Sequence, residues 1–228
     1  MKGDRELILG RIAEALRVPA PRHHESHGNA AAGASVAFRE WLPPVGEEKQ
    51  DQVGLFARLS ETLRTEFREC ATAEEAASQI ATLAQDGNWK CIALHSGKLI
   101  DAVAAKLPST VTLLNVDQGY EKNALEACDA GFTECESLVA QTGSVCITNP
   151  SSGGRALSVL PPHHIVVATR AQMAPDLSAA YDRLAEKYPN GYPSFISFIT
   201  GPSRTGDIER ILVLGAHGPK RLTVLLLP

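Results

Sequence analysis

Apolar runs of strand length alternate with amphipathic helical segments along residues 72–116. Residues 72–75 (TAEE) are typical of a capping box, and the apolar side chains that follow them recur at helical spacing. The sequence then predicts a strand over residues 89–95, a helix over 99–107 and a second strand over 111–116. A strand, a helix and another strand in this order form a β-α-β unit, which restricts the fold to an α/β layered domain around a mostly parallel sheet.

The same alternation continues on both sides of this unit. Upstream, apolar side chains at spacings of three and four residues predict one long helix over residues 47–70, with Phe67 near its end. Downstream, helices are predicted over residues 121–128 and 176–188, and strands over 138–141, 145–148, 164–169, 194–200, 211–214 and 222–227. The sequence contains no internal repeat, so we expect a single α/β domain.

The N-terminal part differs in composition from the rest of the chain. A helix is predicted from Asp4, because apolar side chains recur at helical spacing up to Leu16. Residues 19–35 hold almost no large apolar side chain and no periodicity, which is typical of a flexible linker. We therefore expect an N-terminal helix with its linker over residues 1–35 and the α/β domain over residues 36–228. We also expect the helix to dock on a neighbouring subunit or on a partner.

Charge and hydropathy argue against two classes of partner. The chain has 22 Lys and Arg against 26 Asp and Glu, a formal net charge of −4, and no block of like charges, so a nucleic-acid surface is not expected. The apolar runs are far shorter than the roughly 20 residues of a membrane-spanning helix, so we expect no membrane span. Asp4, Glu6 and Glu14 interrupt the N-terminal apolar residues, unlike the uncharged core of a secretory signal. The expected location is the cytoplasm.

The spacing of the cysteines argues against a redox cofactor held by this chain. The five cysteines are Cys70, Cys91, Cys128, Cys135 and Cys146, and no two of them form a CxxC pair. A zinc site or an iron–sulfur cluster usually needs closely spaced thiolates. We therefore expect no metal and no cluster in this chain, and each cysteine is interpreted as a small buried hydrophobic residue.

The most distinctive segment for ligand binding is residues 200–209 (TGPSRTGDIE). A Gly-Pro turn exposes backbone N–H groups, two hydroxyl residues follow it, and Arg204 adds a planar fork of donors. At the carboxyl end of a strand such a set suits a small carboxylate or phosphate. The alternative is structural, with Ser203 capping a helical turn and Arg204 paired with Asp207 or Glu209. The candidate ligand residues of this segment are Gly201, Ser203, Arg204, Thr205, Asp207 and Glu209.

Two other polar turns are candidates for the same site. One is the AQTGS segment, whose candidate ligand residues are Thr142, Gly143 and Ser144. Its alternative interpretation is an ordinary hairpin turn between two short strands. The other is the SSGGR loop that ends at Arg155, which is either a linker or a lid over an anion.

Histidines supply candidate general bases, because imidazole titrates near neutrality. His163 and His164 stand at the entrance of a predicted strand, and His217 lies in the last turn of the chain. His217 is also counted among the candidate ligand residues. No GxSxG or HExxH motif accompanies these histidines, so purely structural roles stay open.

The C-terminal sequence resembles a known family. Residues 199–227 (ITGPSRTGDIERILVLGAHGPKRLTVLLL) resemble the terminal signature of the lactate utilisation protein C family, the LUD domain proteins. Residues 140–144 and 155–167 add to the resemblance, although Gln141 stands where glutamate is common, and the likeness extends over roughly residues 36–228. The resemblance implies a three-layer α/β/α fold, similar to the group of ribose-phosphate isomerase, glucosamine-phosphate deaminase and CoA-transferase.

The resemblance also implies a function. The family is expected to act with two iron–sulfur partner proteins in oxidising lactate to pyruvate, so the clusters are expected in the partners and no cofactor in this chain. Arg204 would clamp a small carboxylate, with Ser203, Thr205 and the backbone amides of Thr142 and Gly143 completing the site. Two alternatives stay open, an independent enzyme acting on a sugar phosphate or a CoA ester, and a regulatory or scaffold protein. No catalytic residue follows from the resemblance, and homo-oligomer formation is left open.

Overall fold

The computed structural model describes residues 4–15, 17, 42–205, 213–215 and 217–228, and the chain divides into two compact units, Met1–Pro43 and Pro44–Pro228. In the first unit helix α1 (Asp4–Ala15) confirms the predicted N-terminal helix. The predicted linker lies outside the described residues. The division at residues 35 and 36 therefore stays a prediction.

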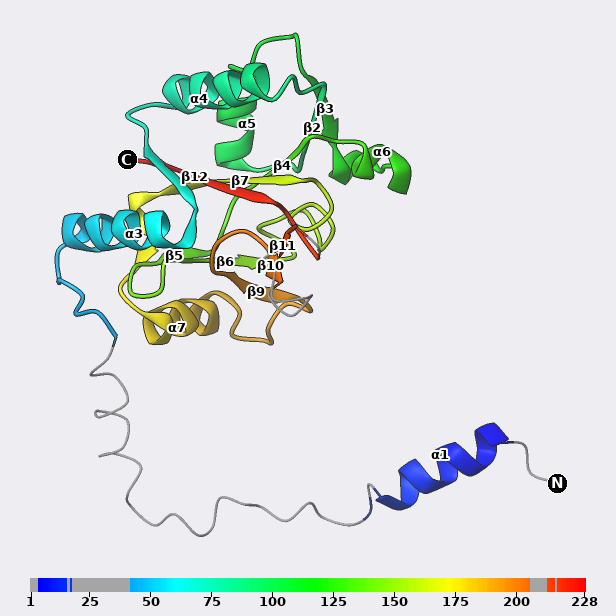
Figure 1. The fold of residues 1–228 in the computed structure, drawn as a ribbon. Coiled ribbons are helices and arrows are strands. Elements are labelled where there is room, and N and C mark those ends of the chain that lie inside the picture. Colours follow the sequence, from blue (N-terminus) through cyan, green and yellow to red (C-terminus); the bar gives the residue numbers. More distant parts are fainter. Residues whose placement is uncertain (1–3, 16, 18–41, 206–212, 216) are drawn as a thin grey trace. The chain divides into compact units, whose positions relative to one another are not determined.

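A six-stranded, fully parallel sheet forms the centre of the second unit (Figure 1). Its strands are β1 (Glu66–Glu69), β12 (Arg221–Leu227), β7 (His163–Thr169), β4 (Ala130–Thr133), β2 (Cys91–Leu94) and β3 (Thr112–Asn115), in that spatial order. Helices α4 (Ala73–Asp86) and α5 (Lys98–Ala104) pack on one face of this sheet. The predicted β-α-β unit is confirmed, because β2 and β3 pair in parallel across α5.

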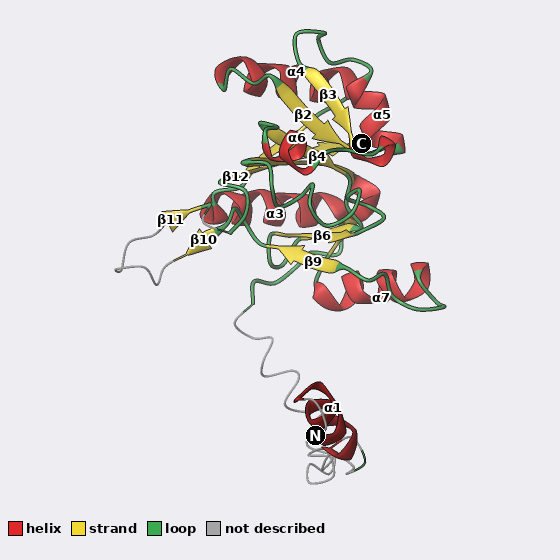
Figure 2. Cartoon of the chain, turned by 90° about the vertical axis from the view of Figure 1, so that its right-hand side faces the viewer, coloured by secondary structure: helices red, strands yellow, loops and turns green. Residues whose placement is uncertain are grey.

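The other face of the main sheet packs on a helix and on a second, smaller sheet (Figures 1 and 2). The helix is α3 (Lys49–Leu63), and the small sheet has the order β8 (Met173–Ala174), β5 (Ser137–Val139), β6 (Ser144–Thr148) and β9 (Ile196–Ile199). Helix α7 (Leu177–Lys187) covers the outer face of the small sheet through Ala180. The short elements are α6 (Lys122–Glu126), two 3-10 turns at Val116–Gln118 and Arg170–Gln172, and the pair β10 (Arg204–Thr205) and β11 (Val213–Leu214).

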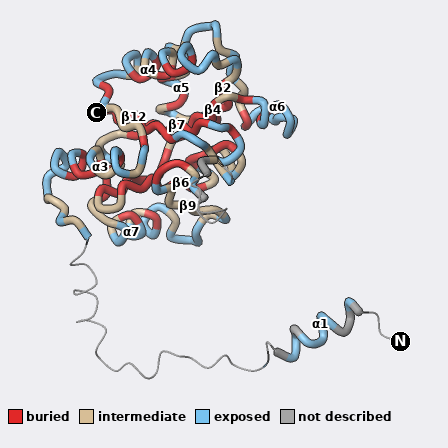
Figure 3. Tube along the Cα trace, in the orientation of Figure 1, coloured by how far each residue is buried: buried red, intermediate tan, exposed pale blue. Residues whose placement is uncertain are grey.

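The architecture is therefore the predicted α/β fold, with helices on both sides of a mostly parallel sheet. Figure 3 shows that buried residues are concentrated in the two sheets and on the helix faces turned toward them. Among the described residues no helix is both long enough and apolar enough to cross a membrane. All five cysteines are free thiols; four are buried, and Cys91 is partly exposed.

Side chains alternate between the two faces of β7, and this alternation separates two neighbouring histidines. His164, Val166 and Ala168 share one face, and the two apolar members of this set pack in the core between the sheets. His163 points to the opposite face, where its ring lies edge-on to Trp89. Adjacent histidines of one strand thus belong to different environments.

The helix predicted over residues 47–70 is shorter than expected. It ends at Leu63, because Arg64 adopts a left-handed conformation with φ 61° and closes the helix. The chain then forms β1, where Phe67 pairs with Val224 of β12. The apolar spacing that suggested further helical turns instead places Phe67 against Phe56 of α3, with the two ring centroids 5.3 Å apart.

The predicted capping box is present in part. Thr72 Oγ1 accepts a hydrogen bond from the Glu75 backbone N–H at 3.2 Å and so caps α4. The Glu75 carboxylate instead accepts from the backbone N–H of Ala71, one residue before the cap. The helix nevertheless begins where the motif predicts.

Candidate functional site

The structure brings two of the predicted ligand segments together. Strands β6 and β9 pair antiparallel, so the AQTGS turn before β6 meets the residue that follows β9. Ser144 Oγ lies 2.7 Å from Thr200 Oγ1 and 2.8 Å from Thr142 Oγ1, which gives a continuous chain of three hydroxyls. The predicted hairpin is confirmed, because β5 and β6 pair antiparallel across this turn.

Two glycines let these turns approach the end of α3. Gly143 and Gly201 have φ values of +64° and +82°, in the region that favours glycine. A Cβ atom on Gly143 would lie 2.7 Å from Leu63 Cδ1, and one on Gly201 would lie 2.8 Å from the Leu63 carbonyl oxygen. Packing against Leu63 therefore accounts for both glycines, and Gly143 serves this contact whether or not its amide also meets a ligand.

Arg204 lies in a short hairpin, not in a helical turn. It begins β10, which pairs antiparallel with β11, and Ser203 therefore precedes a strand. The Ser203 backbone is fixed on both sides, since its N–H donates to the Pro219 carbonyl and its carbonyl accepts from the Gly215 N–H, each at 2.9 Å. The alternative in which Ser203 caps a helical turn is wrong.

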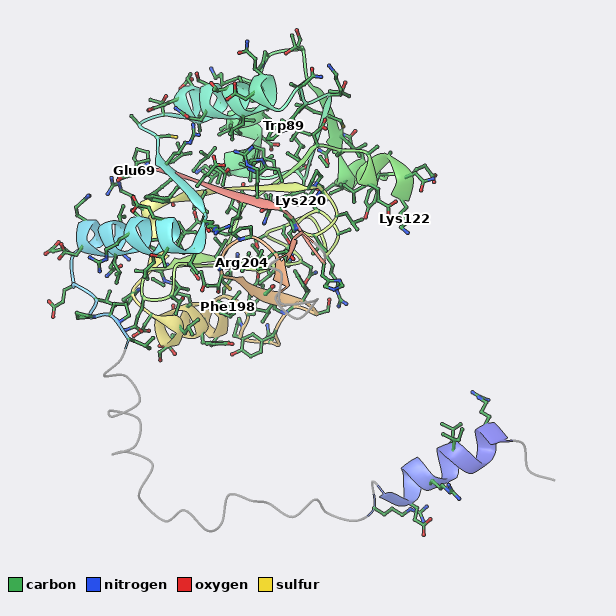
Figure 4. The ribbon with its side chains drawn as sticks, viewed as in Figure 1. Glu69, Trp89, Lys122, Phe198, Arg204 and Lys220 are labelled. Atoms are coloured by element: carbon green, nitrogen blue, oxygen red, sulfur yellow. The ribbon has the colours of Figure 1, made fainter. Side chains whose placement is uncertain are left out.

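The Arg204 guanidinium reaches back toward Gly201. Its Nη2 lies 3.3 Å from the position that a Cβ atom on Gly201 would occupy, and no carboxylate of the described part of the chain pairs with it. Figure 4 marks Arg204 together with Phe198 of β9 and Lys220 before β12. The side chain of Thr205 and the whole of Asp207 and Glu209 lie outside the described residues, so pairing of Arg204 with either carboxylate stays a prediction.

A cavity of about 270 Å³ opens between the two sheets beside this hairpin. It lies at the carboxyl end of β9 and at the amino ends of β7 and β12, and three candidate ligand residues, Gly201, Ser203 and His217, line it. Its walls are largely apolar, formed by Val159, Phe195, Ile199 and Leu222. Thr142, Gly143, Ser144 and Arg204 stand next to the cavity through Thr200 and Gly201, without lining it.

Arg155 contacts one residue of the cavity wall and its neighbour in the chain. Its Nη2 donates to the Ser194 carbonyl at 2.8 Å, and its guanidinium carbon lies 6.0 Å from the ring centroid of Phe195. Because the Phe195 ring lines the cavity, Arg155 supports this wall.

Sequence reasoning did not connect Ser158 and His164 with the ligand segments, yet both line the cavity. They are 2% and 1% exposed, and within the described residues neither Ser158 Oγ nor His164 Nδ1 has a hydrogen-bond partner. His164 Nε2 lies 2.9 Å from Thr133 Oγ1, which fixes the ring. The sequence shows the pair His163 and His164, but it does not indicate which face of their strand borders a cavity.

Both histidines of β7 are uncharged at neutral pH. Burial, and then the nearby His163, lowers the pKa of His164 to about 3. Burial, and then the charge of Arg221, lowers the pKa of His163 to about 4. Rings with so low a pKa accept protons poorly at neutrality. Of the two, only His164 lines the cavity, where it can serve as a neutral hydrogen-bonding group.

The crevice at the carboxyl ends of the parallel strands is occupied by the chain itself. Strand order changes direction between β2 and β4, where α/β sheets commonly bind ligands. Here Glu134 Oε1 accepts from the Leu99 and Ile100 backbone N–H groups at 2.8 and 3.3 Å. Because this carboxylate stands where an anion would meet α5, the crevice is poorly suited to a phosphate. Across the described residues no group of three or more His, Cys, Asp or Glu side chains is arranged to hold a metal ion.

Comparisons with known proteins match most of this chain to one family. The model of the family described as LUD domain matches residues 54–227. Lactate utilization protein C of Bacillus subtilis (strain 168) is 34% identical over 115 residues, which are 49% of this chain and 48% of the relative. Its namesake in Geobacillus kaustophilus (strain HTA426) is 26% identical over 193 residues, 80% of each chain. The alignments with the first three relatives thus span about half of their length.

A solved structure shares the fold. It is a DUF162 family protein from Deinococcus radiodurans, with a TM-score of 0.63 and 20% identity, and the match covers 80% of this chain and 100% of that chain. At this identity the likeness concerns the fold alone.

Proposed function

The chain belongs to the LUD domain family, and from this premise we propose that it is a cytoplasmic component of a system that oxidises lactate to pyruvate. The curated relatives in both alignments above carry the name lactate utilization protein C, which supports a role in lactate utilisation. Oxidation of lactate to pyruvate releases two protons and two electrons. In the proposal two iron–sulfur partner proteins take up the electrons, and this chain holds no cofactor and contributes by binding the acid or by docking the partners.

One observation carries the ligand part of the proposal. An arginine without a carboxylate partner among the described residues lies beside Gly201, which lines the cavity together with Ser203 and His217. A guanidinium can donate two parallel hydrogen bonds to one carboxylate, and nearby hydroxyls can complete the contact. A small carboxylate is the ligand that fits this arrangement, with Arg204 as its clamp.

Reconstitution tests the role in lactate oxidation. When this chain and two iron–sulfur candidates are co-expressed and purified, lactate-dependent reduction of an artificial electron acceptor should require all three proteins. Omission of this chain should abolish the reaction. Full activity with the two iron–sulfur proteins alone would remove this chain from the oxidation step.

Arg204→Ala tests the clamp. Loss of a charge-assisted, two-pronged contact should weaken lactate binding by about tenfold to a hundredfold in calorimetric titration. Arg58→Ala, which removes an exposed arginine of α3 that does not line the cavity, is the matched control and should leave the dissociation constant unchanged. Equal lactate affinity in the Arg204→Ala and wild-type proteins would contradict the assignment of the clamp.

A further inference from the structure

Two residues that line the cavity each hold a buried polar atom without a hydrogen-bond partner in the described part of the chain. Ser158 Oγ and His164 Nδ1 both belong to residues that line it, and both residues are almost fully buried. Buried polar atoms in folded proteins are nearly always hydrogen-bonded, because leaving one unpaired costs about 1–3 kcal/mol. Two such atoms in one cavity point to a ligand that supplies the missing partner.

The fold holds both groups in place from different directions. His164 projects from β7 and is tied through Nε2 to Thr133 of the neighbouring strand β4. Ser158 follows Leu157, whose carbonyl oxygen lies directly against Gly131 of the same strand. A hydrogen bond therefore ties the His164 side chain to β4, and the backbone next to Ser158 packs on the same strand. We call these two residues the polar floor of the cavity.

The charge of this floor selects the type of ligand atom. His164 is neutral, as its lowered pKa indicates, and Ser158 has a neutral hydroxyl. No Asp, Glu, Lys or Arg side chain of the described residues lines the cavity. A hydroxyl or carbonyl oxygen can bond to an imidazole nitrogen and a serine hydroxyl without bringing a charge into an apolar site, whereas a buried carboxylate would lack a cation.

The size of the cavity exceeds that of lactate. A volume of about 270 Å³ equals the liquid volume of about nine water molecules, which is more than a three-carbon acid occupies. The space beyond the polar groups is bounded by Phe195, Ile199 and Leu222, which favour hydrocarbon. The ligand that fills the site therefore carries a side chain larger than methyl.

We propose that the cavity binds a 2-hydroxy or 2-oxo acid with a branched or aromatic side chain, and that His164 Nδ1 and Ser158 Oγ bond its C2 oxygen. The carboxylate end of this ligand rests on the proposed function, in which Arg204 clamps an acid. The oxygen at the floor and the hydrocarbon against the walls rest on the cavity alone.

Binding of three acids to the full chain tests the proposal. We expect 2-hydroxy-4-methylpentanoate to bind at least about tenfold more tightly than lactate, since each extra buried carbon adds affinity. We expect 4-methylpentanoate, which lacks the C2 oxygen, to bind about tenfold more weakly than its hydroxylated counterpart. Equal affinities for the acids with and without the C2 oxygen would overturn the proposal, while a remaining dependence on Arg204 would keep the proposed function.

Matched variants assign the contact to individual residues. Ser158→Ala and His164→Leu should each lower the affinity for 2-hydroxy-4-methylpentanoate by about tenfold and change the affinity for 4-methylpentanoate by less than about twofold. Two control variants lie outside the cavity. Ser60→Ala removes a buried hydroxyl that, like Ser158, has no hydrogen-bond partner among the described residues, and His163→Leu changes the histidine on the opposite face of β7. Neither residue lines the cavity, so both variants should leave the two affinities unchanged. If the two residues had a purely structural role, the affinities for both acids would fall together, and this result would overturn the assignment. If His164→Leu does not fold, Ser158→Ala alone decides.

The uncharged amide of the same 2-hydroxy acid separates the two proposals. If the amide binds as tightly as the acid, and its affinity falls in Ser158→Ala, the contact of the C2 oxygen with the floor is supported and the carboxylate clamp is contradicted. If the affinity for the acid falls in Arg204→Ala but is unchanged in Ser158→Ala and His164→Leu, the carboxylate clamp is supported and the contact of the C2 oxygen with the floor is contradicted.

Discussion

Gly131→Ala is expected to lower the free energy of unfolding by about 3 kcal/mol or more, near the top of the range for overpacking a core. Gly131 lies in β4, which is paired on both sides, with β2 and with β7. An added Cβ would overlap the backbone carbonyl oxygen of Leu157, and backbone cannot rotate away as a side chain can. Urea unfolding followed by circular dichroism measures the change as a lower midpoint with an unchanged slope.

Gly54→Ala provides the matched control. Gly54 is an exposed residue of α3, and no atom lies within 4 Å of an added Cβ. The same substitution should therefore stabilise the protein by about 0.5–1 kcal/mol, because alanine loses less backbone entropy in a helix. Equal stability of Gly131→Ala and wild type would contradict the close approach of Leu157 to β4, and with it the position of the backbone next to Ser158.

The strand that contains Gly131 also shows where sequence reasoning ends. Ala130–Thr133 is only four residues long and includes a glycine, so its local pattern is that of a loop. Its identity as a central strand depends on pairing with β7, more than 30 residues further along the chain. Local patterns were sufficient for β2, α5 and β3, because these elements are consecutive in the sequence and adjacent in the sheet.

The candidate site also has parts that local sequence patterns predict and parts that depend on pairing between distant segments. The AQTGS and TGPSR segments are each recognisable as polar turns, but their meeting depends on the pairing of β6 with β9, which joins Ser144 to Thr200 across 56 residues. Strand alternation indicates that His163 and His164 point to opposite faces. Which of them meets a cavity depends on how the small sheet packs, and no local pattern of residues encodes that.

The place of the cavity follows from the same packing. The rule for α/β sheets favours the carboxyl ends of the parallel strands, where Glu134 already satisfies the amide groups of α5. The cavity instead lies at the amino ends of β7 and β12, because β9 of the small sheet ends there and leaves space beside the β10–β11 hairpin. The small sheet therefore determines where the cavity lies in this fold.

A polar cluster around Glu136 attaches α7 to the small sheet. The Glu136 side chain is 7% exposed, and its Oε1 accepts from Thr148 Oγ1 and from the Tyr188 hydroxyl, each at 2.6 Å. Its Oε2 accepts from Lys187 Nζ at 2.6 Å. Burial opposes ionisation of Glu136, but the hydrogen bonds from Lys187, Thr148 and Tyr188 outweigh it, so the pKa of Glu136 is lowered.

Glu136→Gln is expected to cost about 1.5–3 kcal/mol of unfolding free energy at pH 7, the range for hydrogen bonds to a charged group. Because the pKa of Glu136 is lower in the folded state, its ionised form stabilises the protein above the unfolded-state pKa of about 4.3. This contribution is lost as the pH falls through the lower, folded-state pKa. The stability difference between wild type and Glu136→Gln should therefore be largest at neutral pH and shrink below about pH 4.

Urea unfolding at pH 7 and pH 3.5 measures this difference, with Glu126→Gln as the control. Glu126 forms an exposed ion pair with Lys122 on α6, at 3.3 Å, and exposed pairs contribute less than about 1 kcal/mol. Its substitution should change stability little at either pH. A Glu136→Gln protein as stable as wild type at pH 7 would show that α7 is held by its apolar contacts alone, through Ala180 and the residues around it. Phe195, which lines the cavity, lies on the segment between α7 and β9. Its position would then not depend on the hydrogen bonds of Glu136.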